Sequence, residues 1–291
     1  IQREGLILEV VDFLKIAHHH ERPNAKYYID NIFSDFIELS GDRLYGNDPS
    51  VVGGIATLDG IPVTVIGQLK GRNTEENIKY NFSMSKLEGY RKILRLMKQA
   101  EKFKRPVICF VDTFGAYPGK EAEERGQGNA IANCLMESMY LQTPIISVLL
   151  GDGGSGGALA LCIADVVLAL EYATLSVIAP QACANILWKD SSKSLEAATL
   201  LKMQACDLLE LGLVDKILPE PNEGAHTAPE MMIKIINKSL KQEIKRCMKY
   251  SPRKLVKQRS SKYKNIGISY LYYNKPYRDN SLIKRSSNEK E

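Results

Sequence analysis

The sequence predicts an α/β fold built on a mainly parallel β-sheet. Between residues 105 and 202, short apolar segments alternate with segments of helical periodicity. Two of the apolar segments begin directly after a proline, Pro106 or Pro144, and both run into a loop of small and polar residues. Repeated strand–loop–helix units place neighbouring strands parallel, so their loops meet at the same carboxyl edge of the sheet.

Composition is that of a soluble globular protein with one large domain or two small ones. The chain has 291 residues, of which 44% are hydrophobic and 25% are charged. No segment approaches the roughly 20 apolar residues that span a bilayer, and no signal-peptide core is present. The six cysteines form no Cys-x-x-Cys pair, which favours a reducing, cytoplasmic location and argues against a bound metal.

Charge is distributed unevenly along the chain. Residues 231–291 contain 17 Lys and Arg but 4 Asp and Glu, whereas the preceding residues contain 22 and 30. A basic end is found in proteins that bind nucleic acid or a membrane surface. Its polar, Tyr-containing composition is more typical of a solvated, partly disordered tail, so we expect neither a nucleic-acid nor a membrane partner.

The chain is expected to start with a helical arm over residues 1–40. Apolar residues at helical spacing predict helices over 2–16 and 24–39, separated by Pro23. Such an arm packs either on a partner chain or on the protein's own core. The consecutive residues His18, His19 and His20 point in different directions on a helix, so they are expected to be an exposed polar segment and not a metal site.

The body of the protein is expected to span residues 41–228. Asp59-Gly60 between two β-branched segments predicts a hairpin of strands 51–58 and 61–67. A polar segment, 68–81, is expected to be a mobile loop, and apolar residues at spacings of three and four predict a helix over 86–104. The segments that follow are a strand 107–111, a loop 112–119, a helix 121–141, a strand 145–150, a glycine turn 151–157 with a helix after it, a strand 165–170, an apolar segment 174–178, helices near 181–188 and 194–202, and a helix that ends at Gly212 before a short strand.

The last part of the chain, residues 229–291, is expected to contain one helix and a loosely held tail. The helix is predicted to run from about Pro229 to Lys249, and the tail to begin after Pro252.

The glycine turn is the strongest candidate for a functional site. It reads Gly151-Asp-Gly-Gly-Ser-Gly-Gly157 between an apolar strand and an Ala/Leu-rich helix. Glycines permit positive φ angles and let a ligand approach the main chain. The free N–H groups at the start of the helix, together with the helix dipole, suit an anion or a developing oxyanion. The 112–119 loop is expected to lie next to this turn at the same sheet edge.

The same residues fit three functional patterns, besides a purely structural turn. Gly151-x-Gly153-x-x-Gly156, with Glu171 about twenty residues later, matches the dinucleotide fingerprint. Gly153-x-Ser155-x-Gly157 matches the nucleophile elbow of a serine hydrolase, which would act on an acyl thioester, although no histidine is expected near Ser155. The third pattern is the oxyanion turn of a crotonase-fold carboxyltransferase.

The order of several motifs supports the third pattern. The chain contains, in sequence, Gly41-Asp-Arg43, Val52-Gly-Gly-Ile-Ala56, Glu88-Gly-Tyr-Arg-Lys92, Asp112-Thr-Phe-Gly-Ala-Tyr-Pro-Gly119, Ala122-Glu-Glu-Arg-Gly-Gln127, the glycine turn, Ile186-Leu-Trp-Lys-Asp190 and Asp207-Leu-Leu-Glu-Leu-Gly-Leu213. Over residues 5–270 this series resembles the carboxyltransferase α subunit of bacterial-type acetyl-CoA carboxylase. The resemblance implies a crotonase-like (ClpP/crotonase) spiral of ββα units.

The resemblance also implies a reaction and its partners. The carboxyl group would move from carboxybiotin, carried on a separate biotin carboxyl carrier protein, to acetyl-CoA, which gives malonyl-CoA for fatty acid biosynthesis. A carboxyltransferase β subunit, in an α2β2 complex, and biotin carboxylase would be the other partners, and the zinc ribbon would belong to the β subunit. A non-catalytic scaffolding subunit is the alternative.

The site residues follow from the same resemblance. Backbone N–H groups of Gly156 and Gly157 would be the oxyanion donors. Substrate would contact residues of the turn and of the 112–119 loop, namely Gly153, Gly154, Ser155, Gly115, Ala116 and Tyr117.

Some positions depart from the family pattern. Phe114 replaces a usual proline, Asp152 a usual glutamate and Cys162 a usual glycine. Residues 179–182, Ala-Pro-Gln-Ala, replace Ser-Pro-Glu-Gly. Phe114 and the 179–182 segment border the expected site, so their effect would fall on activity before fold.

Overall fold

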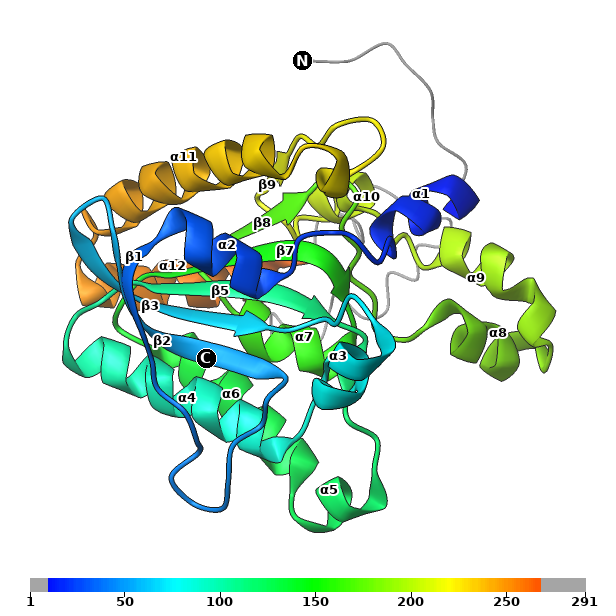
Figure 1. The fold of residues 1–291 in the computed structure, drawn as a ribbon, viewed down its shortest axis with the longest axis horizontal. Coiled ribbons are helices and arrows are strands. Elements are labelled where there is room, and N and C mark those ends of the chain that lie inside the picture. The colour runs from blue at the N-terminus through cyan, green and yellow to red at the C-terminus, as the bar shows by residue number, and fades with distance from the viewer. Residues whose placement is uncertain (1–9, 268–291) are drawn as a thin grey trace, which may run out of the picture.

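A seven-stranded β-sheet runs through the protein, in a computed structural model that describes residues 10–267 (Figure 1). The strand order is β1-β2-β3-β5-β7-β8-β9. Strands β1, β2 and β3 pair antiparallel, whereas β3, β5, β7, β8 and β9 form the predicted parallel part. The strand bounds are Ser34–Glu38 (β1), Val51–Leu58 (β2), Ile61–Gln68 (β3), Val107–Thr113 (β5), Ile145–Gly153 (β7), Val166–Leu170 (β8) and Lys216–Leu218 (β9).

Helices cover both faces of this sheet. On one face lie α2 (Ala25–Ile32) and α11 (Pro229–Cys247), and on the other lie α4 (Leu87–Lys102), α6 (Gln127–Tyr140) and α7 (Ser155–Cys162), as Figure 1 shows. A helix with apolar residues on one side buries that side against the sheet, and all residues of β5, β7 and β8 are buried between the two layers. The other helices are α1 (Val10–Ala17), α3 (Thr74–Lys79), α5 (Lys120–Glu124), α8 (Pro180–Trp188), α9 (Ser194–Leu200), α10 (Ala205–Glu210) and α12 (Pro252–Asn265), with 3₁₀ turns at 81–83, 191–193 and 225–227.

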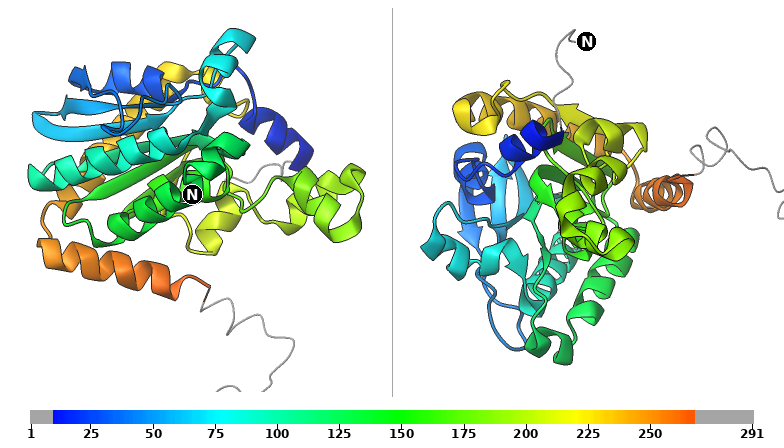
Figure 2. Two further views of the ribbon diagram at one scale, coloured as in Figure 1. Left: turned by 90° about the horizontal axis from the view of Figure 1, so that it is seen from below. Right: turned by 90° about the vertical axis from the view of Figure 1, so that its right-hand side faces the viewer.

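Two smaller features lie at the carboxyl edge of the parallel strands. A short parallel sheet joins β4 (Met84–Ser85) to β6 (Gly115–Ala116). Helices α8 and α9 pack on each other and project from the body of the molecule, with α1 beside α9 (Figures 1 and 2).

The predicted turns are confirmed. Asp59 and Gly60 both adopt positive φ angles, 54° and 78°, as a two-residue hairpin turn requires. Gly212 follows α10 with a φ of 72°, the left-handed conformation that ends many helices.

The predicted helix over residues 24–39 is wrong after Ile32. The chain becomes extended at Phe33 and continues as β1 on the edge of the sheet, paired with β2. Apolar residues at 32, 36 and 39 fit a helical spacing, but β1 is mostly exposed and so lacks the alternating pattern of a half-buried strand. From Ala25 on, α2 packs on the protein's own core through Tyr28 and Ile29.

Two other predicted elements differ in detail. The segment 68–81 is not only a loop, because it contains α3, whose first turn is capped by the side chain of Asn73. The predicted helix 121–141 is divided into α5 and α6 at Gly126, which has a φ of 93°.

The loosely held tail is wrong for residues 252–265, which form α12 and pack on α6. Arg259 of this helix is 1% exposed and forms an ion pair with Asp165. Its guanidinium also donates to the backbone oxygens of Ser138, Leu141 and Thr143. The basic composition of this segment therefore gave no indication that Arg259 has a buried partner. The rest of the predicted tail, 268–291, lies outside the described residues.

Candidate functional site

The turn between β7 and α7 is shorter than the sequence predicts. Strand β7 continues through Gly153 and α7 begins at Ser155, so Gly154 alone lies between them. Ser155, and none of the five glycines of the turn, adopts a positive φ, 51°. The glycines other than Gly156 are therefore needed for space and not for left-handed backbone.

That space is taken by other backbone segments. A Cβ on Gly154 would lie 2.1 Å from the carbonyl oxygen of Phe114, and one on Gly157 would lie 2.6 Å from the carbonyl carbon of Gly115. Real Cβ atoms do not approach other atoms so closely. The 112–119 loop and the glycine turn are in direct contact, as predicted from the sheet edge they share.

Backbone N–H groups at the turn fall into two sets. The amides of Gly154, Ser155 and Gly115 donate to Thr113 O, Ser176 O and Thr113 Oγ1 at 2.8, 2.7 and 3.0 Å. Those of Gly156 and Gly157, in the first turn of α7, donate to no acceptor within residues 10–267. Two unpaired donors at the positive end of a helix dipole can bind an anion or a developing negative charge.

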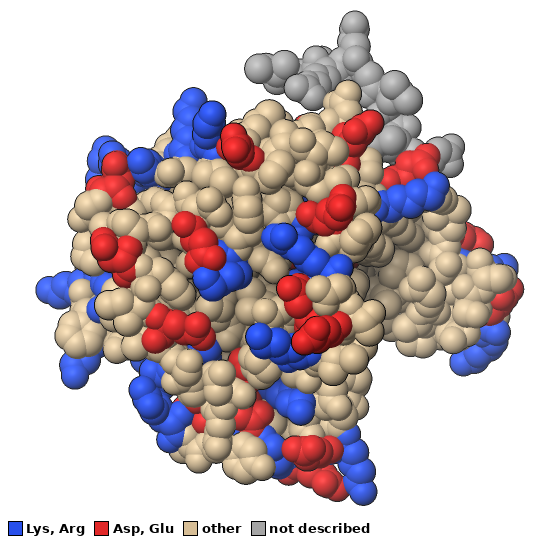
Figure 3. Space-filling model, in the orientation of Figure 1, with Lys and Arg blue, Asp and Glu red and all other residues tan. Residues whose placement is uncertain are grey.

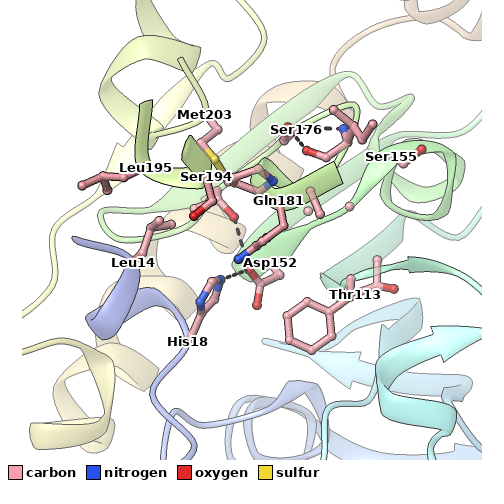
Figure 4. Close-up of a pocket in the computed structure, with 17 residues that line it drawn as sticks. Leu14, His18, Thr113, Asp152, Ser155, Ser176, Gln181, Ser194, Leu195 and Met203 are labelled. Atoms are coloured by element: carbon pink, nitrogen blue, oxygen red, sulfur yellow. Dashed lines mark hydrogen bonds and ion pairs between the residues drawn. The ribbon is translucent and has the colours of Figure 1, made fainter. Parts of the chain in front are cut away.

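A cavity of about 320 Å³ lies against the turn (Figure 4). Gly153, Gly154 and Ser155 line it, whereas Gly156 and Gly157 are not among its lining residues. The predicted residues Gly115, Ala116 and Tyr117 are likewise outside the lining and belong to the β4–β6 side of the turn. The other lining residues are Leu14, His18, Thr113, Phe114, Asp152, Thr174, Ser176, Ile178, Ala179, Pro180, Gln181, Ser194, Leu195 and Met203.

An ionic cluster that the sequence reasoning did not foresee lies at this cavity. The Lys70 ammonium donates to Asp152 Oδ2 at 2.6 Å and lies 3.9 Å from Asp112 Oδ1. The Asp152 amide donates to Asp112 Oδ1 at 3.0 Å, and His18 Nε2 lies 2.8 Å from Asp152 Oδ1. Residues that follow α1 and β3 therefore meet residues of β5 and β7 at one carboxylate.

The cluster shifts the pKa values of its members in different directions. Burial raises the pKa of Asp112, and the nearby Lys70 only partly opposes this. Burial also acts on Asp152, but the hydrogen bond from His18 and the charge of Lys70 outweigh it and lower its pKa. Although burial alone would lower the pKa of Lys70, Asp112 and Asp152 raise it. Asp152 and Lys70 are therefore a charged pair.

A sequence signal existed for part of this cluster. Asp112 and Asp152 each follow a buried strand, and these strands are neighbours in a parallel sheet, so their carboxylates had to be close. Nothing marked His18, because a contact across 134 residues leaves no local pattern.

The structure also bears on the two other motif readings. His18 lines the same cavity as Ser155, contrary to the expectation that no imidazole lies near it. Figure 4 places the two residues on opposite sides of the cavity, and His18 is hydrogen bonded to Asp152 and not to Ser155. Glu171 accepts a hydrogen bond from the backbone of Glu220, at 2.9 Å, and is thereby engaged within the protein.

Within residues 10–267 there is no group of three or more His, Cys, Asp or Glu side chains that could hold a metal ion. The helices of the same residues include none long and apolar enough to cross a membrane.

Comparison with known proteins gives a consistent result. Residues 6–267 match the family described as acetyl co-enzyme A carboxylase carboxyltransferase-like. The acetyl-coenzyme A carboxylase carboxyl transferase subunit alpha of Clostridium botulinum (strain Eklund 17B / Type B) is 54% identical over 254 residues, which cover 87% of this chain and 93% of that protein. The same subunit of Geobacillus sp. (strain WCH70) is 52% identical over 256 residues, 88% of this chain and 79% of that protein.

Solved structures show the same fold at lower identity. Transcarboxylase 12S with methylmalonyl-coenzyme A and methylmalonic acid bound is 20% identical, with a TM-score of 0.61 over 80% of this chain and 44% of that chain. A chain of a Pseudomonas malonate decarboxylase hetero-tetramer in complex with coenzyme A is 18% identical, with a TM-score of 0.61 over 78% of this chain and 92% of that chain. These similarities confirm the predicted crotonase-like α/β fold.

Proposed function

The chain belongs to the acetyl-CoA carboxylase carboxyltransferase α-subunit family, and we propose that the start of α7 is where it stabilises charge during carboxyl transfer. The observation that carries this proposal is the pair of unpaired amides of Gly156 and Gly157. They lie beside a cavity lined by Gly153, Gly154 and Ser155. Gly115 and Ala116 contact the turn at Gly157, from its other side.

Carboxybiotin is the substrate that this arrangement fits, through a ureido oxygen that becomes negative as the carboxyl group leaves. The two amides can donate to such an oxygen, and neither residue carries a side chain that would block its approach. The amides are positioned before the substrate arrives, because Gly157 packs on Gly115 and its carbonyl accepts from Gln68 Nε2 at 3.0 Å. No side-chain nucleophile of this chain is required.

Partners supply what this chain lacks. We infer that it works in the cytoplasm in an α2β2 complex with a carboxyltransferase β subunit, together with biotin carboxyl carrier protein and biotin carboxylase. Support comes from the relatives, whose names identify them as one subunit of an enzyme. The lobe formed by α8 and α9 adds further support. Figure 3 shows little charge on its facing surface, and Val177, Ile186, Leu187 and Leu200 of this region are 58–74% exposed. Exposed apolar patches of this kind are typical of protein interfaces, and we assign this one to the β subunit.

The partner requirement can be tested by reconstitution. The purified chain alone should not form malonyl-CoA from carboxybiotin and acetyl-CoA, whereas the chain with a β subunit should, in a complex whose mass contains both. Turnover by the isolated chain would contradict the proposal.

The role of the turn can be tested at Gly156. A Cβ there would meet only Ile131 Cγ2, at an ordinary 3.5 Å, so the fold should tolerate Gly156→Val. The branched side chain should impede access to the two amides. Loss of one such donor interaction costs about 3 kcal/mol, roughly a hundredfold in rate. The assay would compare carboxyl transfer with thermal unfolding and β-subunit binding.

Gly128→Val is the matched control, because Gly128 lies on the neighbouring α6 with no atom within 4 Å of its Cβ position. If the rate falls only as far as the melting temperature does, or equally in both variants, the turn is structural.

A further inference from the structure

His18 comes to the cavity from the N-terminal part of the chain. It directly follows α1, and its imidazole Nε2 lies 2.8 Å from Oδ1 of Asp152, the residue before the glycines of the turn. The His18 side chain is 46% exposed and the Asp152 side chain 7% exposed, so the contact links a solvent-facing ring to a buried carboxylate. Leu14, one helical turn earlier, lines the same cavity.

Asp152 connects His18 to the rest of the site. Its second oxygen accepts from Lys70 at 2.6 Å, and the hydroxyl of Thr174 lies 3.4 Å from the first. The backbone of Asp152 is held by Asp112. Displacing this carboxylate would therefore disturb the strand end that leads into Gly153 and Gly154.

Lys70 and His18 are the basic side chains in contact with Asp152 among the described residues. The Lys70 ammonium also lies 3.9 Å from Asp112 Oδ1. Arg22 is nearby, but it is paired with the buried carboxylate of Glu220. The ring of Phe114 lies edge-on to the His18 ring, with centroids 6.1 Å apart, and its centroid is 4.5 Å from Lys70 Nζ. His18 and Lys70 therefore contact the two oxygens of Asp152 from the two sides of Phe114.

Helix α1 has few other attachments to the body. Its buried residues Phe13 and Ala17 form a small cluster with Tyr172, separate from the main hydrophobic core. The helix also contacts α9. With so small an apolar contact, the polar contact between His18 and Asp152 helps to fix the position of this wall at the cavity.

We propose that His18 is a positioning residue, which holds α1 as a wall of the cavity and holds Asp152 in the place that keeps the glycine turn in its active geometry. This rests on the proposed function in so far as the turn serves carboxyl transfer. The support is the contact itself, between a half-exposed imidazole and a buried carboxylate oxygen 2.8 Å apart. Loss of a residue that positions reacting groups can lower the reaction rate more than its own contact energy suggests, because displacing those groups by about 1 Å can lower the rate about a hundredfold.

The experiment compares three substitutions in the complex with the β subunit. His18→Arg keeps a donor and a permanent charge, His18→Gln keeps only a donor, and His18→Ala keeps neither. His20→Ala is the control, because His20 lies two residues away and outside the cavity lining. Each complex is assayed for kcat and KM from pH 6 to pH 8, and hydrogen exchange of the α1 amides is measured on the chain alone.

We expect His18→Ala to lower kcat/KM about tenfold and to speed exchange in α1, and His20→Ala to do neither. His18→Arg and His18→Gln, which keep a donor to Asp152, should restore kcat/KM and α1 exchange toward the wild type. The proposal is overturned if His18→Ala leaves kcat/KM and α1 exchange as they are in His20→Ala. Hydrogen exchange of the α1 amides tests the role of His18 even if the wild-type complex transfers no carboxyl group. Absence of transfer by the wild-type complex would contradict the proposed function and not the role of His18.

Discussion

The two walls of the cavity are built in different ways. One wall is the carboxyl edge of β5 and β7, where every residue of β7 is buried and the glycine turn touches neighbouring backbone. The opposite wall consists of α8 and α9, which project from the body, and of α1 beside α9, and these helices bury few apolar residues (Figure 2). The first wall can hold donors in fixed positions, and the second can adjust to a partner or substrate. Substitutions that overlap neighbouring backbone in the first wall should change stability, whereas those in the second should change activity or assembly with little loss of stability.

The largest effect on stability is expected at Arg22, where the N-terminal segment has its strongest contact with the body. Arg22 forms a two-pronged ion pair with Glu220, at 2.8 and 2.9 Å, and donates to Leu150 O at 2.7 Å. Glu220 also accepts from the amides of Tyr172 and Ala225. Arg22→Met would leave this buried carboxylate without its cation, which typically costs 3–5 kcal/mol, about half the stability of a domain.

Urea unfolding of the isolated chain would measure this loss. Lys26→Met is the control, because Lys26 and Asp30 form an exposed pair, about half accessible on both sides, that should contribute less than about 1 kcal/mol. If Arg22→Met and Lys26→Met had similar free energies of unfolding, the Arg22 ion pair would contribute no more to stability than an exposed pair does.

The next largest effect on stability should come from adding one methyl group at Gly154, in the wall formed by the ends of β5 and β7. A Cβ on Gly154 would overlap the carbonyl of Phe114, with distances of 2.1 Å to its oxygen and 2.3 Å to its carbon. Because the obstacle is backbone, Gly154→Ala must move the 112–116 loop, and overpacking of this kind costs about 1–3 kcal/mol. Gly156→Ala, two residues later, should be neutral or slightly stabilising, since alanine favours a helix. Equal melting temperatures of Gly154→Ala and Gly156→Ala would show that the turn is less tightly packed than β7.

The same contrast explains what the sequence could predict. The buried hairpin, the parallel strands and the glycine turn were predicted because their apolar periodicity and turn residues are local signals. Strand β1 was predicted as helix because it lies at the sheet edge, where exposure removes the alternating pattern. Helix α12 was predicted as a loose tail because its anchor, Arg259 with Asp165, joins residues 94 apart. Contacts at such separations leave no pattern in the chain near either residue.

For the site, the predicted residues were those that carry a backbone motif. The turn and the 112–119 loop do meet, but Gly156 and Gly157 lie outside the lining of the cavity that Gly153 to Ser155 share. The side chains that give the cavity its charge, Lys70 and His18, were not predicted. Lys70 lies in the segment predicted to be a loop, and His18 lies in the predicted N-terminal arm.

The smallest expected effect concerns a second histidine contact of the N-terminal segment. His226 stacks on His19 with ring centroids 3.7 Å apart, and its Nδ1 is buried with no hydrogen-bond partner among the described residues. Burial, followed by the charges of His19 and Arg22, lowers the pKa of His226 below its ordinary 6.5. The unfolded chain therefore binds this proton at a higher pH than the folded chain does. The contribution of His226 to stability is complete above that value and is lost as the pH falls through the range below it.

His226→Phe should flatten this dependence, because phenylalanine keeps a ring to stack on His19 but has no proton to bind. Urea unfolding at pH 5, 6 and 7 would give the free energy of unfolding for the wild type and the variant. The wild type should lose more stability than the variant between pH 7 and pH 5. If His226→Phe retains the wild-type slope, acid acts on the N-terminal segment through another group.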